Sequence, residues 1–340
     1  MTFGDAVTGN GTLAPAQDRL APTSAGPRTR TARVLRAVGR RLLAVAGVLL
    51  GAATLAFGAL QLIPGDPVSV LLGPSTQASP RVRAEITHDY GFDQPLLVQY
   101  GHFMGRLARG DLGISYQLQR PVSDLIAEQV RPTVELAAAA IVLAIVLAIV
   151  FAVATAGRRS LGRTLAIGWE LLAASTPSYW VGLLLLTALS FQAHIFPVSG
   201  DDGLRALVLP GLTLALPLAG VLGQVLREGL DAALAQPHVV SAQARGTGVV
   251  ALRLRHALRH ATLPLVTLAG WLIGALLGGA VVVETVFGRP GIGALALSAV
   301  SSRDMPVVTG VVLLSATVFV TISTVVDLLY PVLDPRLRKV

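Results

Sequence analysis

The chain has 340 residues, of which 53% are hydrophobic and only 14% are charged, and it carries a formal net charge of +8. Charged residues make up about a quarter of a soluble domain, so this composition predicts a membrane protein with several spans. There is no cysteine, which excludes disulfides and thiolate metal sites, and the six histidines lack metal-ligand spacing. We therefore expect no catalytic residue, no metal and no cofactor in this chain.

Six apolar segments are long enough to cross a bilayer core, which needs about 20 residues per helix. They lie near 40–63, 133–157, 164–193, 206–227, 263–287 and 307–331. The first segment could be read as a signal peptide, but it is longer than a typical signal sequence and follows a polar stretch of about forty residues. We predict that it is an uncleaved first helix within residues 36–63 and that the whole chain is an all-α polytopic membrane protein.

Basic residues set the predicted orientation. Most of the 27 Lys and Arg residues fall in the N-terminal segment and in every second connection after it, and basic connections face the cytosol. Both termini are then cytosolic. Residues 1–35 have too little apolar periodicity to fold, so we expect a disordered cytosolic tail there, and residues 336–340 form a short cytosolic tail.

Residues 64–131 form the longest connection, which this orientation places outside the membrane. Ser79-Pro80 and Gln94-Pro95 each predict a helix start, and the apolar residues after Pro95 recur at helical spacing up to Gly110. Two amphipathic helices are therefore expected in this outer loop. They could form a lid over the bundle or a landing surface for an external protein.

The sequence argues against nucleotide binding by this chain. Its only lysine is Lys339, so the phosphate-binding pattern G-x-x-x-x-G-K-[ST] cannot occur. Among the acidic residues near membrane depth, Glu170 alone lies well inside a predicted span. An ionisable group at that depth is a functional candidate, although a structural role near a helix end is equally compatible with its position.

The connection at 228–262 is a basic loop rich in Ala and Gly between two apolar spans. Ser241, Ala242 and Gly246 are expected to keep side chains small along one stripe of a short helix, so that a partner can approach the backbone. Arg245 and other arginines surround that stripe. An ordinary cytosolic loop explains the arginines but not the small residues followed by Leu263-Pro264.

Several short sequence motifs along the chain resemble those of one protein family. They are I-P-G-D-P (63–67), Q-P-L-L-V-Q-Y (94–100), R-G-D-L-G-I-S-Y (109–116), R-P-V (120–122), T-P-S-Y-W-V-G (176–182), V-L-P-G-L-T-L-A-L-P (208–217), R-H-A-L-R (255–259), L-P (263–264), G-G-A-V-V-V-E-T-V-F (278–287), P-G-I-G (290–293), R-D-M-P-V-V (303–308) and D-L-L-Y-P-V-L-D-P-R (327–336). Their order and spacing are similar to the dipeptide/oligopeptide/nickel-type permease subunits of bacterial ABC importers. We read P-G-I-G and R-G-D-L-G as turns whose glycines adopt positive φ.

This resemblance implies a type I ABC importer permease fold with six transmembrane helices, an outer two-helix loop and a five-helix core at 132–335. It implies an inner-membrane location in bacteria and four kinds of partner: a homologous second permease, two ABC ATPase subunits, an external substrate-binding protein and the lipid bilayer. ATP and Mg would be used by the ATPase subunits. The residues implied in ATPase coupling are Val239, Val240, Ser241, Ala242, Arg245, Gly246, Leu263 and Pro264, and those implied in binding-protein contact are Arg109, Asp111, Gly113 and Ser115.

The expected function is ATP-driven import of di- or oligopeptides. Within the family the alternatives are nickel or metal–chelator complexes, glutathione and haem. A channel or a proton-coupled carrier is the alternative from another class. It would need a filter motif or a relay of buried charges, and the sequence shows neither.

Overall fold

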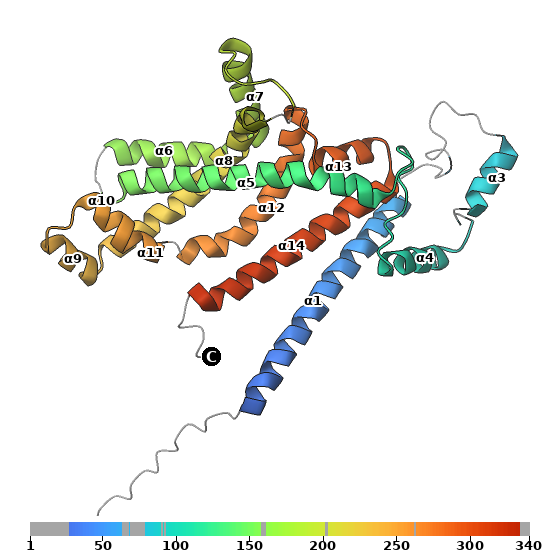
Figure 1. Ribbon diagram of the computed structural model, residues 1–340, viewed down its shortest axis with the longest axis horizontal. Helices are drawn as coiled ribbons and strands as arrows, with labels where there is room; N and C mark the ends of the chain where they lie inside the picture. Colours follow the sequence, from blue (N-terminus) through green and yellow to red (C-terminus); the bar gives the residue numbers. More distant parts are fainter. Residues whose placement is uncertain are drawn as a thin grey trace, which may run out of the picture. The chain divides into compact units, whose positions relative to one another are not determined.

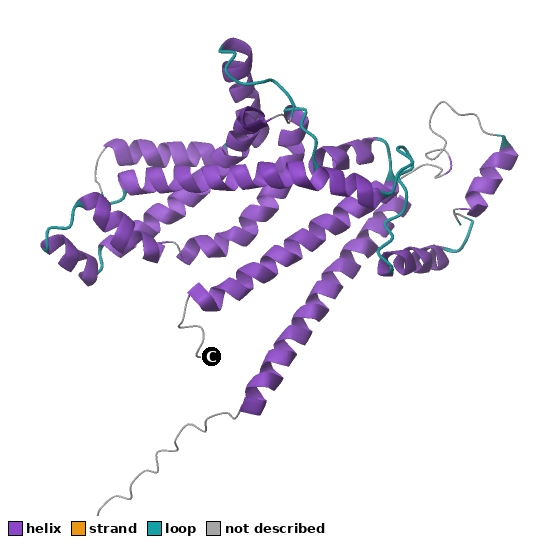
Figure 2. Ribbon diagram, in the orientation of Figure 1, coloured by secondary structure: helices purple, strands orange, loops and turns teal. Residues whose placement is uncertain are grey.

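The computed structural model describes residues 27–62, 68, 79–89, 91, 93–157, 161–200, 203–261 and 263–333. Within these ranges every regular element is a helix (Figure 2), as the sequence predicts. The chain divides into two compact units, Met1–Ala46 and Gly47–Val340, which are described separately. The described part of the first unit is the N-terminal half of one long helix, and all remaining described elements belong to the second unit.

The helices follow one another along the chain as shown in Figure 1. They are α1 (Pro27–Leu62), α3 (Pro80–Asp89), α4 (Leu96–Ala108), α5 (Val122–Thr155), α6 (Leu161–Ser175), α7 (Ser178–Leu185), the π-helix η1 (Leu186–Gln192), α8 (Gly203–Leu234), α9 (Pro237–Ala244), α10 (Val249–Ala251), the π-helix η2 (Leu252–Ala257), α11 (Leu258–Ala261), α12 (Leu263–Val286), α13 (Ile292–Ser301) and α14 (Met305–Leu333).

The predicted end of the disordered N-terminal tail, at residue 35, is wrong. Helix α1 begins at Pro27, so residues 27–35 are helical. Proline suits a first helical turn because the N–H that it lacks would have no intrahelical partner there, and the following Arg, Ala and Leu residues favour the helix. Residues 1–26 and the C-terminal tail at 336–340 lie outside the described residues.

Among the described residues, four helices are long and apolar enough to span a membrane: Gly39–Ala59 within α1, Val122–Thr155, Gly203–Leu234 and Met305–Asp327 within α14. The pair α6 and α7–η1 counts as a fifth span if its two bent halves are taken together. The sixth predicted span, 263–287, corresponds to α12, of which Gly274–Val286 qualifies as a shorter apolar helix. The multi-span, all-helical architecture is therefore confirmed within the described residues.

The predicted span at 164–193 is not one straight helix. It breaks between Ser175 and Ser178 and bends there by 106°. Pro177 explains the break, because proline has no N–H for the helical ladder and disfavours the helical conformation of the residue before it, Thr176. The second half continues as a π-helix from Leu186.

Helix α8 is the central helix of the second unit, and 67% of its most apolar window is buried. It packs against α5, and the two run side by side in Figure 1. Helix α5 presents Ala140, Ala144, Ala148 and Ala152 to this contact, each four residues from the next and each at most 2% exposed. Small residues at this spacing lie on one helix face, which lets the two backbones approach closely. In a membrane, where the hydrophobic effect does not drive helices together, the close packing of such faces stabilises the pair.

Candidate functional site

The loop after α8 folds back on itself around a small core. Helix α9 starts with Pro237 in its first turn, and Val239 and Ala242 on its inner side are 0% and 1% exposed. They pack against Leu252 of η2, with Leu234 at the end of α8 alongside. The loop from the end of α8 through α11, residues 235–261, is thus a compact unit with its own apolar contacts, which we call the knob.

Gly246 ends α9 in the left-handed conformation, with φ of +85°. The N–H of Gly246 bonds to the carbonyl of Gln243 at 2.9 Å, and the N–H of Thr247 bonds to the carbonyl of Ala242 at 3.3 Å. These two bonds form a Schellman motif, in which glycine is favoured because it has no Cβ. A Cβ placed on Gly246 meets no atom within 4 Å, so here glycine serves the turn.

The predicted stripe of small residues is wrong in one respect: its members do not share a face. Ala242 points into the knob, whereas Ser241 and Gly246 are exposed. The reason is the helical period, since Ala242 follows the buried Val239 by three residues and Ser241 follows the exposed Pro237 by four.

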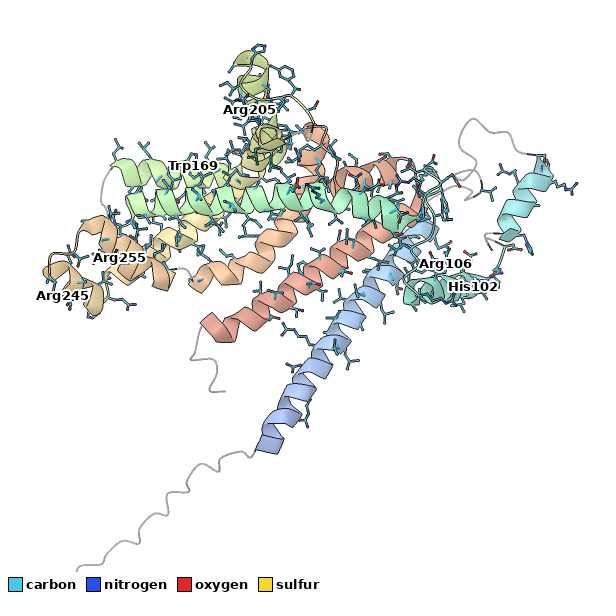
Figure 3. All side chains as sticks on the ribbon, viewed as in Figure 1. His102, Arg106, Trp169, Arg205, Arg245 and Arg255 are labelled. Carbon is cyan, nitrogen blue, oxygen red and sulfur yellow. The ribbon has the colours of Figure 1, made fainter. Side chains whose placement is uncertain are left out.

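The outer face of α9 is formed by Pro237, Ser241 and Arg245, all exposed. The hydroxyl of Ser241 donates to the carbonyl of Pro237 at 2.9 Å. Arg245 lies at the far end of the knob in Figure 3, and Arg255 lies on η2. Among the other predicted coupling residues, Pro264 is exposed at the start of α12, and the side chains of Val240 and Leu263 lie outside the description.

The knob is fixed to two long helices. Arg253, only 3% exposed, donates from Nη1 to the carbonyl of Val153 on α5 at 2.7 Å. Ala261 of α11 lies against α8, where a Cβ on Gly229 would stand 3.0 Å from the Ala261 Cα. A displacement of the knob therefore acts directly on α5 and α8.

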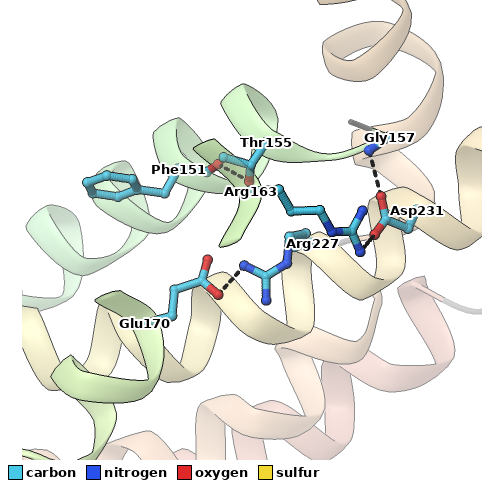
Figure 4. Close-up of polar contacts among 7 residues, drawn as sticks. All are labelled: Phe151, Thr155, Gly157, Arg163, Glu170, Arg227 and Asp231. Carbon is cyan, nitrogen blue, oxygen red and sulfur yellow. Dashed lines mark hydrogen bonds and ion pairs between the residues drawn. The ribbon is translucent and has the colours of Figure 1, made fainter. Parts of the chain in front are cut away.

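Two ion pairs tie α6 to α8 near the same end (Figure 4). Glu170 is 0% exposed and pairs with Arg227, whose side chain is 6% exposed. About one turn further along α8, Asp231 pairs with Arg163 at 2.8 Å and accepts the N–H of Gly157 at 2.7 Å. Asp231 therefore also holds the end of α5 against α8.

Glycines allow this close contact. A Cβ on Gly220 would stand 2.6 Å from the carbonyl oxygen of Glu170 and 2.9 Å from the nitrogen of Ala174, which is too close for any side chain. A Cβ on Gly223 would stand 3.0 Å from Glu170 Oε1, an oxygen that has no hydrogen-bond partner among the described residues. Sequence reasoning singled out Glu170 but missed Arg227, which lies 57 residues away and carries no local signal of the pairing.

At the other end of the bundle, Asp304 organises the segment R-G-D-L-G-I-S-Y. Its carboxylate accepts the hydroxyl of Ser115, the N–H of Tyr116 at 3.1 Å and the N–H of Gln117 at 3.2 Å. Ser115 is 0% exposed and Asp304 2%. The segment is thereby attached to the start of α14.

The predicted contact residues of this segment have different environments. Arg109 and Asp111 are exposed, Gly113 is half-buried and Ser115 is buried. Gly113 has φ of +86°, which agrees with the predicted turn, and its N–H bonds to Asp111 Oδ1 at 2.8 Å. The Ser115 side chain offers no surface of its own and acts by holding the turn through Asp304.

Glu284 is a further deeply buried acid beside Glu170 and Asp304, at 1% exposure. It accepts the hydroxyl of Thr133 at 2.6 Å and the N–H of Ala294 at 3.0 Å, and Thr133 in turn accepts the N–H of Ile292 at 2.8 Å. A carboxylate here satisfies the free N–H groups and the positive dipole end of α13. Glu284 thus joins α12, α5 and α13.

The prediction that P-G-I-G needs positive φ is wrong. Gly291 has φ of 166°, which is ordinary extended backbone, and Gly293 is part of α13. Glycine is required for space instead, since a Cβ on Gly291 would stand 2.2 Å from the Glu284 carboxylate and one on Gly293 would stand 2.4 Å from the Val281 Cα.

The apolar helices and the buried polar contacts between them define a multi-pass membrane protein. The chain belongs to the family of binding-protein-dependent transport system inner membrane components, whose model matches residues 140–339, while the model of the family's N-terminal region matches residues 34–137. It is therefore the permease component of a binding-protein-dependent importer.

Curated relatives extend over nearly the whole chain. The glutathione transport system permease protein GsiC of Salmonella typhimurium (strain LT2) is 36% identical over 310 residues, covering 90% of this chain and 99% of that protein. GsiC of Escherichia coli O6:H1 is 34% identical over 310 residues with the same coverage. A putative peptide transport system permease protein of Brucella abortus (strain 2308) is 35% identical over 317 residues, covering 91% of this chain and 99% of that protein.

Proposed function

We propose that this permease works in an ATP-driven importer for short peptides and that α9 is the helix through which an ATPase subunit drives it. The observation that carries this proposal is the knob: an exposed face of Pro237, Ser241 and Arg245 on a helix whose inner side is packed and whose base is fixed to α5 and α8. Such a rigid projection transmits force to the bundle.

The complex that this role requires contains a second, homologous permease, two ABC ATPase subunits and an external substrate-binding protein. ATP and Mg belong to the ATPase subunits, in keeping with Lys339 being the only lysine of this chain. The knob and both termini then face the cytosol of a bacterium, and residues 79–122 face outward. ATP-dependent closure of the ATPases would move the bundle by rigid-body rocking.

Arg109 and Asp111 are the exposed residues of the outer turn, so we assign binding-protein contact to them. Gly113 and Ser115 shape the turn through the Asp111 and Asp304 carboxylates. Docking of a binding protein on this turn would act on α14, because Asp304 directly precedes that helix.

Di- or oligopeptides are the proposed substrates, and glutathione, itself a tripeptide, belongs to the same chemical class. The names of the Salmonella and Brucella relatives support this class. Nickel or metal–chelator complexes and haem remain the alternatives within the family. The proton-coupled carrier finds less support, because Glu170 pairs with an arginine and Glu284 caps a helix.

The test uses Ser241→Glu in the complete transporter, with Ser241→Ala as the matched control. The glutamate adds a bulky charge to the exposed face of α9, whereas alanine only removes the bond to Pro237. The glutamate projects from the face where the partner would dock and can also pair with Arg245 four residues later, so it both blocks close approach and neutralises a basic group of that face. ATPase co-purification and dipeptide uptake should therefore fall by about two orders of magnitude or more for Ser241→Glu.

Ser241→Ala should keep both activities within about twofold, the size of a typical surface change. Membrane insertion is measured for both variants by the amount of chain in washed membranes. Normal insertion, normal co-purification and parental uptake by Ser241→Glu would show that α9 is not the docking helix.

A further inference from the structure

Helix α4 is amphipathic and is not buried by the rest of the described chain. Leu96, Leu97, Tyr100, Phe103, Met104 and Leu107 recur at helical spacing and lie on one side. None of its residues is buried, and Leu96 and Leu97 are 56% and 85% exposed. An apolar face of this kind requires a cover.

The opposite side of α4 is basic. His102 and Arg106, labelled on α4 in Figure 3, are exposed and four residues apart, which places them on one side of the helix, away from the apolar residues. A helix with an apolar face and a basic face is suited to lie in the plane of a membrane interface, where cations meet lipid phosphates and apolar side chains enter the acyl region.

Contacts with α1 fix the depth of α4. The hydroxyls of Thr54 and Tyr100 are hydrogen-bonded at 2.8 Å, and the Phe57 ring lies 5.3 Å from the Tyr100 ring and 5.5 Å from the Phe103 ring between centroids. The apolar span of α1 ends at Ala59 and the helix at Leu62. At a rise of about 1.5 Å per residue, Phe57 lies about 3–8 Å below these two ends.

That depth is where interfacial helices place their apolar faces, about 5–10 Å into the boundary between headgroups and acyl chains. Helix α4 is attached at this level through Tyr100 and Phe103, and the most exposed of its other apolar residues, Leu96 and Leu97, continue the same face. The contact with a membrane-spanning helix thus brings an uncovered apolar surface to lipid level, with the positive charge of Arg106 on its other side.

We propose that α4 lies in the headgroup layer of the membrane, with Leu96 and Leu97 in lipid and with His102 and Arg106 binding lipid phosphates. This surface holds the R-G-D-L-G-I-S-Y turn, which follows α4 directly, at a fixed height above the bilayer. The inference rests on the proposed function only in assigning α4 to the outer leaflet.

The test exploits the absence of cysteine in the natural chain. Leu97→Cys and His102→Cys, on opposite sides of α4, are each spin-labelled in the complete transporter in lipid nanodiscs containing phosphatidylglycerol. Collision with oxygen, which is lipid-soluble, is compared with collision with a water-soluble nickel chelate. The oxygen-to-nickel ratio should be about tenfold higher at position 97 than at position 102, as expected when only one face enters lipid.

A second variant tests the charge. In the Leu97→Cys protein, replacing phosphatidylglycerol by phosphatidylcholine should lower the oxygen-to-nickel collision ratio of the label by about twofold or more. Adding Arg106→Gln to the same protein should remove most of this dependence on the lipid. Equal ratios at the two positions overturn the proposal, and so does a label at position 97 that becomes protected from the nickel chelate only when binding protein is added.

Uptake is measured in parallel with the same labelled proteins. A lipid-buried position 97 in a complex that fails to take up peptide contradicts the proposed function and leaves the membrane contact of α4 intact. Peptide uptake with a water-exposed position 97 contradicts the membrane contact alone.

Discussion

The buried pair of Glu170 and Arg227 gives the sharpest energetic prediction. Glu170 is 0% exposed and the Arg227 side chain 6% exposed, so neither charge has water to stabilise it alone. Arg227→Met leaves the carboxylate buried without its partner, and breaking a buried pair in this way costs about 3–5 kcal/mol. The double change Glu170→Leu with Arg227→Met removes both charges and should bring stability back to within about 1 kcal/mol of the parent.

The neighbouring pair supplies a matched control. Arg163 and Asp231 are 33% and 27% exposed, so solvent screens their attraction, and Arg163→Met should cost only about 0–1 kcal/mol. The unfolding temperatures of four transporters in nanodiscs are compared: the parent, Arg227→Met, the double variant and Arg163→Met. Equal losses for Arg163→Met and Arg227→Met, or a double variant as unstable as Arg227→Met, would refute the reasoning from burial.

Three further predictions follow from close contacts and turn geometry. Gly220→Ala should destabilise the protein by about 1–3 kcal/mol, because its Cβ would stand 2.6 Å from a backbone oxygen of α6, whereas Gly168→Ala, in open helical space, should be neutral or stabilising in the same melting assay. Gly246→Ala should weaken the end of α9 by about 1–2 kcal/mol, seen as faster amide exchange, while Gly248→Ala, at φ of −62°, should leave exchange unchanged. Asp304→Asn replaces one of the two oxygens that accept three donors by an NH2 group, which is itself a donor, so stimulation of ATP hydrolysis by a binding protein should fall severalfold with basal hydrolysis retained. Equal loss of both rates would show that the turn is not a docking element.

Much of the architecture could be predicted because each span satisfies its own backbone and shows its length as an apolar run. The break at Thr176-Pro177 was also readable, since proline within a helix interrupts the ladder, but the continuous apolar composition around it favoured one span. The knob could be placed from its Ala, Gly and Arg composition. Its inner and outer faces depended on where α9 starts, which composition does not determine.

Contacts between distant segments could not be predicted from one sequence. Arg227 is a basic residue near the end of a predicted span, and nothing in the sequence indicates that Glu170 of α6 is its partner. Asp304 appears only within the motif R-D-M-P-V-V, which gives no sign of its contact with Ser115. The glycines of P-G-I-G suggested a turn because a sequence shows only that a side chain is missing. The reason, the Glu284 carboxylate occupying that space, comes from another helix.

Under the proposed function, the polar contacts define an order in which motion spreads. Only Ala235 and Gln236 separate α8 from α9, so a pull on the knob acts first on α8. The two ion pairs make α6 follow α8, and α6 ends at the 106° bend before α7. Motion from the cytosolic side therefore reaches α7 through a rigid α6–α8 pair. Loosening that pair by Arg227→Met should reduce uptake more than ATPase binding, whereas Ser241→Glu should reduce both together.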